Sequence, residues 1–190
     1  MLNWTTNSTT FTGNADTINT IYSYFDFDNN LFDFDKITPI PKVLYAIASP
    51  VHIITDEEFK NKYNALPETK EEIEEFLNSY THDKENNTKH EIGLKNITNT
   101  MSDVLYENYD TDNWYDWSYI HWGVKDVGIN ASIDYKSTTK LIVTYDTPWN
   151  TPNGIFEILQ ARFSELNIIN MSCSDSLHDE MAVTWRNDQN

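Results

Sequence analysis

The residues best suited to do chemistry lie close together in the chain, within residues 113–149. Asp116, His121, Lys125 and Asp146 supply carboxylates, an imidazole that titrates near neutral pH, and a cation. If the fold brings them into one cleft, they could act as base, acid and electrostatic stabiliser in a small enzyme or ligand-binding protein. The alternative, which we favour, is that these polar groups satisfy backbone turns and indole N–H groups.

Tryptophans gather in the same segment. Four of the six in the chain lie there: Trp114, Trp117, Trp122 and Trp149. A dense cluster of indoles marks either the packing centre of a domain or a recognition surface. We predict that these four side chains bind a partner, and burial in the core is the competing interpretation.

Other catalytic and metal-binding patterns are missing from the sequence. It contains no G-x-S-x-G elbow, P-loop or G-x-G-x-x-G, and its 5 glycines leave little room for phosphate-cradling loops. The histidines form no close pair, and His178-Asp179-Glu180 has the wrong spacing for a helical metal face. The single cysteine, Cys173, excludes an iron–sulfur cluster and is expected to be an inert strand residue. The sequence therefore predicts no metal and no cofactor.

The net charge of −17 is the second strong feature. A field of this sign repels nucleic-acid phosphates and anionic lipid, and it attracts basic proteins. We therefore predict a partner with a basic surface, without direct binding to nucleic acid or to a membrane. Solubility alone is the other explanation. The densest carboxylates, which could face the partner but are more often a solvated helix face, are Glu71, Glu72, Glu74 and Glu75.

The sequence also predicts a cytoplasmic location. No apolar run approaches the roughly 18 residues that a membrane span needs. Residues 1–12 are polar and lack the basic start and apolar middle of a signal peptide. A single cysteine fits a reducing compartment.

The elements that must position these residues follow an α+β pattern. Residues 4–12 are β-branched and polar and predict a strand, and residues 14–25 predict a capped amphipathic helix. Near the C-terminus the sequence predicts a hairpin formed by residues 129–135 and 140–145, followed by a helix that begins near residue 152. Two further strands are predicted at residues 167–173 and 181–185. This order predicts a ferredoxin-like split βαβ fold, an antiparallel sheet with two helices on one face.

We predict one ferredoxin-like domain over residues 1–190. Its core comprises residues 1–25 and 129–190, and residues 26–128 form a mainly helical insertion. Thr55 opens a capping box for a short helix through Tyr63, and a second helix begins near Pro67. A polar stretch at 81–89 predicts a mobile loop, and residues 91–109 predict a third helix.

Several segments together resemble the YubB-like ferredoxin-like proteins of bacteriophages and plasmids. The segments that carry the resemblance are Phe11-Thr12-Gly13, Phe34-Asp35-Lys36-Ile37-Thr38-Pro39-Ile40-Pro41, Asn113-Trp114-Tyr115-Asp116-Trp117, Trp122-Gly123-Val124-Lys125 and Asp146-Thr147-Pro148-Trp149. The chain departs from the family pattern at Ile120-His121, where Glu-Asn is usual, at Val124, and at Asp126-Val127. The resemblance implies an origin in a mobile element and a ferredoxin-like fold, without implying a reaction.

Three hypotheses follow. The first is an acidic, non-enzymatic phage or plasmid protein that binds and modulates a host protein, such as an inhibitor of a defence or nucleic-acid-acting system. The second is the small enzyme or ligand-binding protein built on Asp116, His121 and Lys125. The third is a structural or packaging accessory that assembles as a homo-oligomer.

Overall fold

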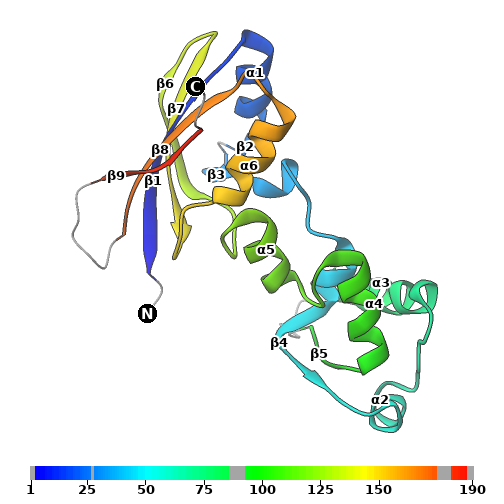
Figure 1. The fold of residues 1–190 in the computed structure, drawn as a ribbon. Helices are drawn as coiled ribbons and strands as arrows, with labels where there is room; N and C mark the ends of the chain where they lie inside the picture. Colours follow the sequence, from blue (N-terminus) through cyan, green and yellow to red (C-terminus); the bar gives the residue numbers. More distant parts are fainter. Residues whose placement is uncertain (1–2, 27, 86–92, 175–180, 188–190) are drawn as a thin grey trace. The chain divides into compact units, whose positions relative to one another are not determined.

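The structure is a computed structural model that describes residues 3–26, 28–85, 93–174 and 181–187. It shows a mixed α+β protein with a five-stranded antiparallel sheet, and the chain divides into two compact units (Figure 1). The sheet unit comprises residues 1–39 and 119–190, and the inserted unit comprises residues 40–118. The inserted unit is thus shorter than the predicted insertion, because residues 26–39 and 119–128 belong with the sheet.

The sheet unit contains the elements that the sequence pattern predicts most clearly. Its strands run in the order β6-β7-β1-β8-β9, and every neighbouring pair is antiparallel. Helices α1 and α6 lie on the same side of the sheet (Figure 1). The bounds are β1 Trp4–Thr12, α1 Ala15–Ser23, β6 Ile129–Lys136, β7 Lys140–Pro148, α6 Asn153–Arg162, β8 Asn167–Ser174 and β9 Ala182–Arg186.

The core of this unit lies between the sheet and the two helices. Alternate residues of β1 and β7 are buried, so each strand presents one face to the helices and one away from them. Asn14 caps α1 by accepting a hydrogen bond from the Thr17 backbone N–H, as the sequence predicts. The helix ends at Ser23, earlier than predicted, because Phe25 begins a short strand.

A phenylalanine cluster closes one side of this core. Strands β2 (Phe25–Asp26) and β3 (Leu31–Phe32) pair with each other, and the short helix η1 (Phe34–Lys36) follows. The Phe32 ring stacks on Phe25 at 4.2 Å and makes edge contacts with Phe34 at 5.0 Å and Tyr145 at 5.2 Å. These contacts explain why residues 26–39 belong to the sheet unit.

A buried hydrogen-bond network crosses the helix-facing side of the sheet. Asn170 accepts a hydrogen bond from the Thr9 hydroxyl at 2.5 Å and donates to the Asn7 amide oxygen at 3.1 Å. It also donates to the Thr184 hydroxyl at 3.0 Å, while Thr9 lies 3.0 Å from the Tyr145 hydroxyl. Burial raises the pKa of Tyr145, so this phenol stays protonated. A network whose members are satisfied in this way favours one strand arrangement over others.

The inserted unit pairs a small parallel ribbon with helices. Residue Thr55 caps α2 through the predicted capping box, in which Glu58 reaches back to the Thr55 N–H at 2.9 Å. The unit contains η2 Lys42–Ala46, β4 Ile47–Ile53, α2 Asp56–Tyr63, α3 Lys70–Glu85, β5 Leu94–Ile97, α4 Asn99–Tyr109 and the start of α5 Trp114–Trp122.

Two predictions for this region are wrong. Within the predicted helix at 91–109, residues 94–97 form the strand β5 and α4 begins only at Asn99, because the buried Thr98 side chain caps a new helix by accepting from the Met101 N–H. Residues 91 and 92 lie outside the described residues. Residues 81–85 of the predicted loop continue α3, and its residues 86–89 lie outside the described residues. Helix α5 was not predicted.

Candidate functional site

The four candidate catalytic residues divide between the two units. Asp116 belongs to the inserted unit, whereas His121, Lys125 and Asp146 belong to the sheet unit. Asp116 lies in the first turn of α5, where its backbone N–H donates to Asn113 and its carboxylate accepts from the Asn113 amide at 2.7 Å. This reciprocal pair caps the helix, which gives Asp116 a structural role.

Asp146 also has structural partners. It lies on the sheet face away from α1 and α6, where its carboxylate accepts from the Thr6 hydroxyl at 2.8 Å and from the Asn130 amide at 2.9 Å. These bonds tie three neighbouring strands together. The sheet therefore uses this carboxylate in a way that does not require chemistry.

His121 lies in the last turn of α5, beside the start of α6. A β-carbon built on Gly154 would lie 2.2 Å from the His121 carbonyl oxygen, so only glycine permits this approach of the two helices. Lys125 is half-buried in the segment after α5. Among the described residues, no group of three metal-ligating side chains exists. His178, whose spacing does not suit a helical metal face, lies outside the described residues.

The four tryptophans do not form one surface, and this corrects the prediction. Trp122 is 2% exposed and donates its indole N–H to the Thr38 carbonyl at 3.0 Å, and Trp117 is 6% exposed. Both fill the core and cannot contact a partner while the protein is folded. Trp149 is 45% exposed and Trp114 is half-buried, so these two can contribute to recognition.

The carboxylates of α3 are also partly used within the unit. Glu72 accepts from the Glu68 and Thr69 backbone N–H groups, which lowers its pKa and caps the helix. Glu74 accepts from the Tyr109 hydroxyl at 2.6 Å and lies 3.8 Å from the Lys70 ammonium. Glu71 and Glu75 are exposed. Glu72 and Glu74 thus make internal contacts, with Lys70 beside Glu74, while Glu71 and Glu75 form a solvated helix face.

A different part of the inserted unit combines acid with an exposed aromatic ring. Tyr106 on α4 is 51% exposed. The carboxylate of Asp112, then burial, then the carboxylate of Asp116 raise the pKa of its phenol. Asp103 precedes Tyr106 by three residues and so lies on the adjoining helix surface. We call Tyr106, Asp103, Asp112 and Asp116 the acidic tyrosine surface.

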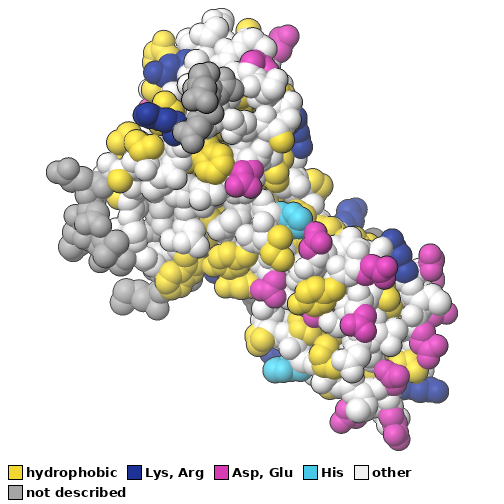
Figure 2. All heavy atoms as spheres, in the orientation of Figure 1, with side chains coloured by type: hydrophobic (Ala, Val, Ile, Leu, Met, Phe, Trp, Pro, Cys, Tyr) yellow, Lys and Arg dark blue, Asp and Glu magenta, His cyan; other side chains and the backbone are white. Residues whose placement is uncertain are grey.

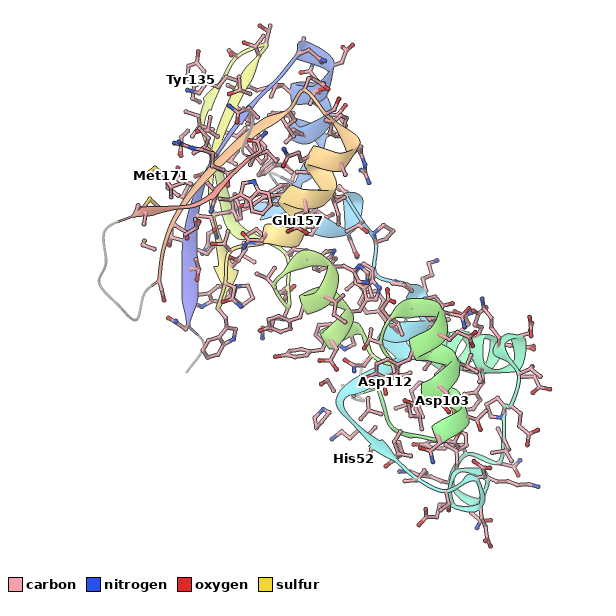
Figure 3. All side chains as sticks on the ribbon, in the orientation of Figure 1. His52, Asp103, Asp112, Tyr135, Glu157 and Met171 are labelled. Atoms are coloured by element: carbon pink, nitrogen blue, oxygen red, sulfur yellow. The ribbon has the colours of Figure 1, made fainter. Side chains whose placement is uncertain are left out.

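Asp112 is the centre of this surface. It is 7% exposed and lies in the turn between α4 and α5, and its carboxylate accepts from the Ser102 hydroxyl and the Asn113 amide. Both donors are neutral, so the negative charge remains to act on its surroundings. Figure 3 shows Asp103 on α4 and Asp112 beside that helix, and Figure 2 shows acidic and hydrophobic side chains together over α4.

The sequence itself contains a signal for this surface. Between Lys95 and Lys125 the chain has no lysine or arginine, while it has five carboxylates and seven tyrosines and tryptophans. Elsewhere in the inserted unit, lysines accompany the acids: Lys60 and Lys62 lie on α2, and Lys70 on α3. The acidic tyrosine surface therefore lies in a stretch of sequence that contains carboxylates and no lysine or arginine, although the Lys70 ammonium of α3 donates to Asn108 of α4 at 2.6 Å.

Comparison with known proteins adds a structural neighbour. No protein-family model matches the chain, and no curated protein matches it. Among solved structures it is similar to the crystal structure of the protein api92 from Yersinia pseudotuberculosis, described under the family model DUF1281. The match has 9% identity and a TM-score of 0.47, and covers 96% of this chain and 93% of that one. A similarity at this level carries no argument about function.

Proposed function

We propose that this protein is a non-enzymatic binding protein that docks on the basic surface of another protein through the acidic tyrosine surface. The observation that supports this most is the position of the Tyr106 ring, which is 51% exposed on α4 close to the carboxylate of Asp112, the first cause of the raised pKa of its phenol. A raised phenol pKa reports a negative potential at a half-exposed aromatic ring. Aromatic rings beside uncompensated charge suit a lysine or arginine of a partner, through both cation–π contact and ion pairing.

The small-enzyme alternative has less support. Asp116 and Asp146 belong to different units, and each accepts hydrogen bonds that explain its position.

The described part of the chain contains no helix long and apolar enough to cross a membrane.

The identity of the partner rests on the resemblance to phage and plasmid proteins. On that basis the partner would be a host protein in the cytoplasm, such as a component of a defence or nucleic-acid-acting system, and the bound protein would modulate or inhibit it. A ferredoxin-like topology is part of the same proposal, supported by the order β6-β7-β1-β8 with α1 and α6 on one side.

Site-specific photo-crosslinking tests this function. p-Azidophenylalanine is placed at Tyr106, and at Tyr135 as the matched control, because both tyrosines are 51% exposed and lie in different units. After irradiation in a bacterial lysate, we expect Tyr106 to capture a basic protein that Tyr135 does not capture. Capture of that basic protein equally from both positions, or capture of acidic proteins from Tyr106, would contradict the proposal.

The captured partner then allows a quantitative check. Replacing Asp103 and Asp116 by asparagine should weaken binding by about 2- to 30-fold, taking about 0.2–1 kcal/mol for each exposed charge. Replacing Asp56 and Glu57 at the start of α2 removes the same charge and should have a smaller effect. Affinity should also fall as salt concentration rises.

A further inference from the structure

The sheet face away from α1 and α6 is a second, separate surface. No described element of the sheet unit covers it (Figure 1). Its apolar side chains include Tyr135 on β6 and Met171 on β8, which Figure 3 shows extending away from the helices. Tyr135 is 51% exposed, Met171 39% and Val183 51%. The strand registers place Tyr135 beside Ile142 and Val183 beside Met171.

The charges of this face are balanced, unlike those of the chain. In the strand register, Lys140 lies opposite Thr12 at one end of the central strands, and Asp146 lies opposite Thr6 toward the other end. Arg186 pairs with Ile169 near the basic end, while Asp134 accepts a hydrogen bond from Thr144, nearer the acidic end. Among the described residues, a chain with a net charge of −17 thus has one face that carries two acids, Asp134 and Asp146, and two bases, Lys140 and Arg186.

We propose that this face binds a second copy of the chain in a two-fold, face-to-face dimer. The proposed two-fold axis runs across the strands, parallel to the plane of the sheet, at the level midway between Ser8 and Thr10. Rotation about this axis reverses the strand direction in the second copy. It places Asp146 of each copy opposite Lys140 of the other, because both lie on β7 at equal distances from that level. It also places Met171 opposite Ile169. The face is therefore complementary to itself in charge and in apolar character.

The size of the face fits a weak but specific dimer. Five strands about 4.8 Å apart and about eight residues long, at about 3.3 Å per residue, outline on the order of 600 Å². Two such faces bury about 1,200 Å², the lower end of specific interfaces. Stacked sheets pack about 10 Å apart, a distance that opposed methionine and isoleucine side chains fill. We expect dissociation in the micromolar range.

Sedimentation velocity of the full chain, from about 1 to about 500 µM, tests the dimer. We expect a reversible monomer–dimer equilibrium that Met171→Glu weakens at least about tenfold, because it buries a carboxylate against an apolar face. Ile53→Glu is the matched control: Ile53 is 47% exposed in the inserted unit, and its replacement should leave the equilibrium unchanged. Lys140→Glu should also weaken the dimer, because it places two carboxylates opposite each other.

A second measurement does not depend on the folding of these variants. p-Azidophenylalanine at Tyr135 should give a covalent dimer of the purified protein on irradiation, whereas the same group at Tyr106 should not. A monomer at the highest concentration, equal effects of Met171→Glu and Ile53→Glu, or crosslinking from Tyr106 alone would overturn the proposal. The first two of these results would leave the proposed basic partner of the inserted unit unaffected, whereas crosslinking from Tyr106 alone would count against that proposal as well.

Discussion

Replacing Asn170 by alanine should strongly destabilise the sheet unit. Asn170 is fully buried, and its side chain joins β1, β8 and β9 through hydrogen bonds to Asn7, Thr9 and Thr184. In the variant, the Asn7 amide oxygen loses the donor that Asn170 supplies. The hydroxyls of Thr9 and Thr184 each lose one hydrogen-bond partner. A buried polar group without its partner costs about 1–3 kcal/mol. With the lost packing of the amide, we expect a loss of about 2–4 kcal/mol.

Hydrogen exchange measured by mass spectrometry suits this test, because it reports β1 and β8 separately from the inserted unit. The control is Asn167→Ala, which removes the same side chain from an exposed position on the same strand and should change stability by less than about 0.5 kcal/mol. If both variants exchange at the same rates in β1 and β8, the network does not stabilise the sheet, and our reasoning about it is refuted.

Three further predictions concern single contacts. Gly154→Ala should cost about 1–3 kcal/mol in thermal unfolding, because its β-carbon would lie 2.2 Å from a carbonyl oxygen of α5, whereas Gly13→Ala, with 3.5 Å to its nearest contact, should cost less. Asp112→Asn should lower the pKa of Tyr106, measured by carbon-13 NMR of labelled tyrosine rings; an unchanged or higher value would show that Asp112 does not set the local potential. Burial and the bond to Glu74 raise the pKa of Tyr109 to about 12. The stability that this shift provides is complete below the unfolded pKa of about 10 and is lost between about pH 10 and 12, so Tyr109→Phe should flatten alkaline unfolding in that window.

The sheet unit was predictable because local signals and tertiary packing agree there. Residues 4–12 and 140–148 alternate between buried and less buried positions, and Asn14 caps α1. Helix α5 was not predictable in this way, because aromatic residues such as Trp114, Tyr115, Trp117 and Trp122 occur all around it and give no single apolar stripe. The start of α4 was missed because Ile97 and Met101 have helical spacing although Thr98 separates a strand from a helix.

The site was less predictable than the fold. Residue types in the segment 113–149 suggested one cleft, yet hydrogen bonds within α5 and within the sheet account for the positions of Asp116 and Asp146, and residue type alone does not reveal such bonds. Burial removed Trp117 and Trp122 from the binding candidates, because packing and recognition use the same residue type. Tyr106 and Asp112 were missed because their role depends on which carboxylates the turn between α4 and α5 brings close to the phenol.

The most direct test of the acidic tyrosine surface is an NMR titration of the labelled protein with a basic amphipathic peptide of lysine and leucine. The peptide can choose among all the carboxylates of the chain, so the test compares surfaces within one molecule. We predict that backbone shifts concentrate on residues 103–116 and that Asp112→Asn reduces them. Shifts that are strongest on α2 or α3, or that spread evenly over both units, would contradict the proposed docking surface.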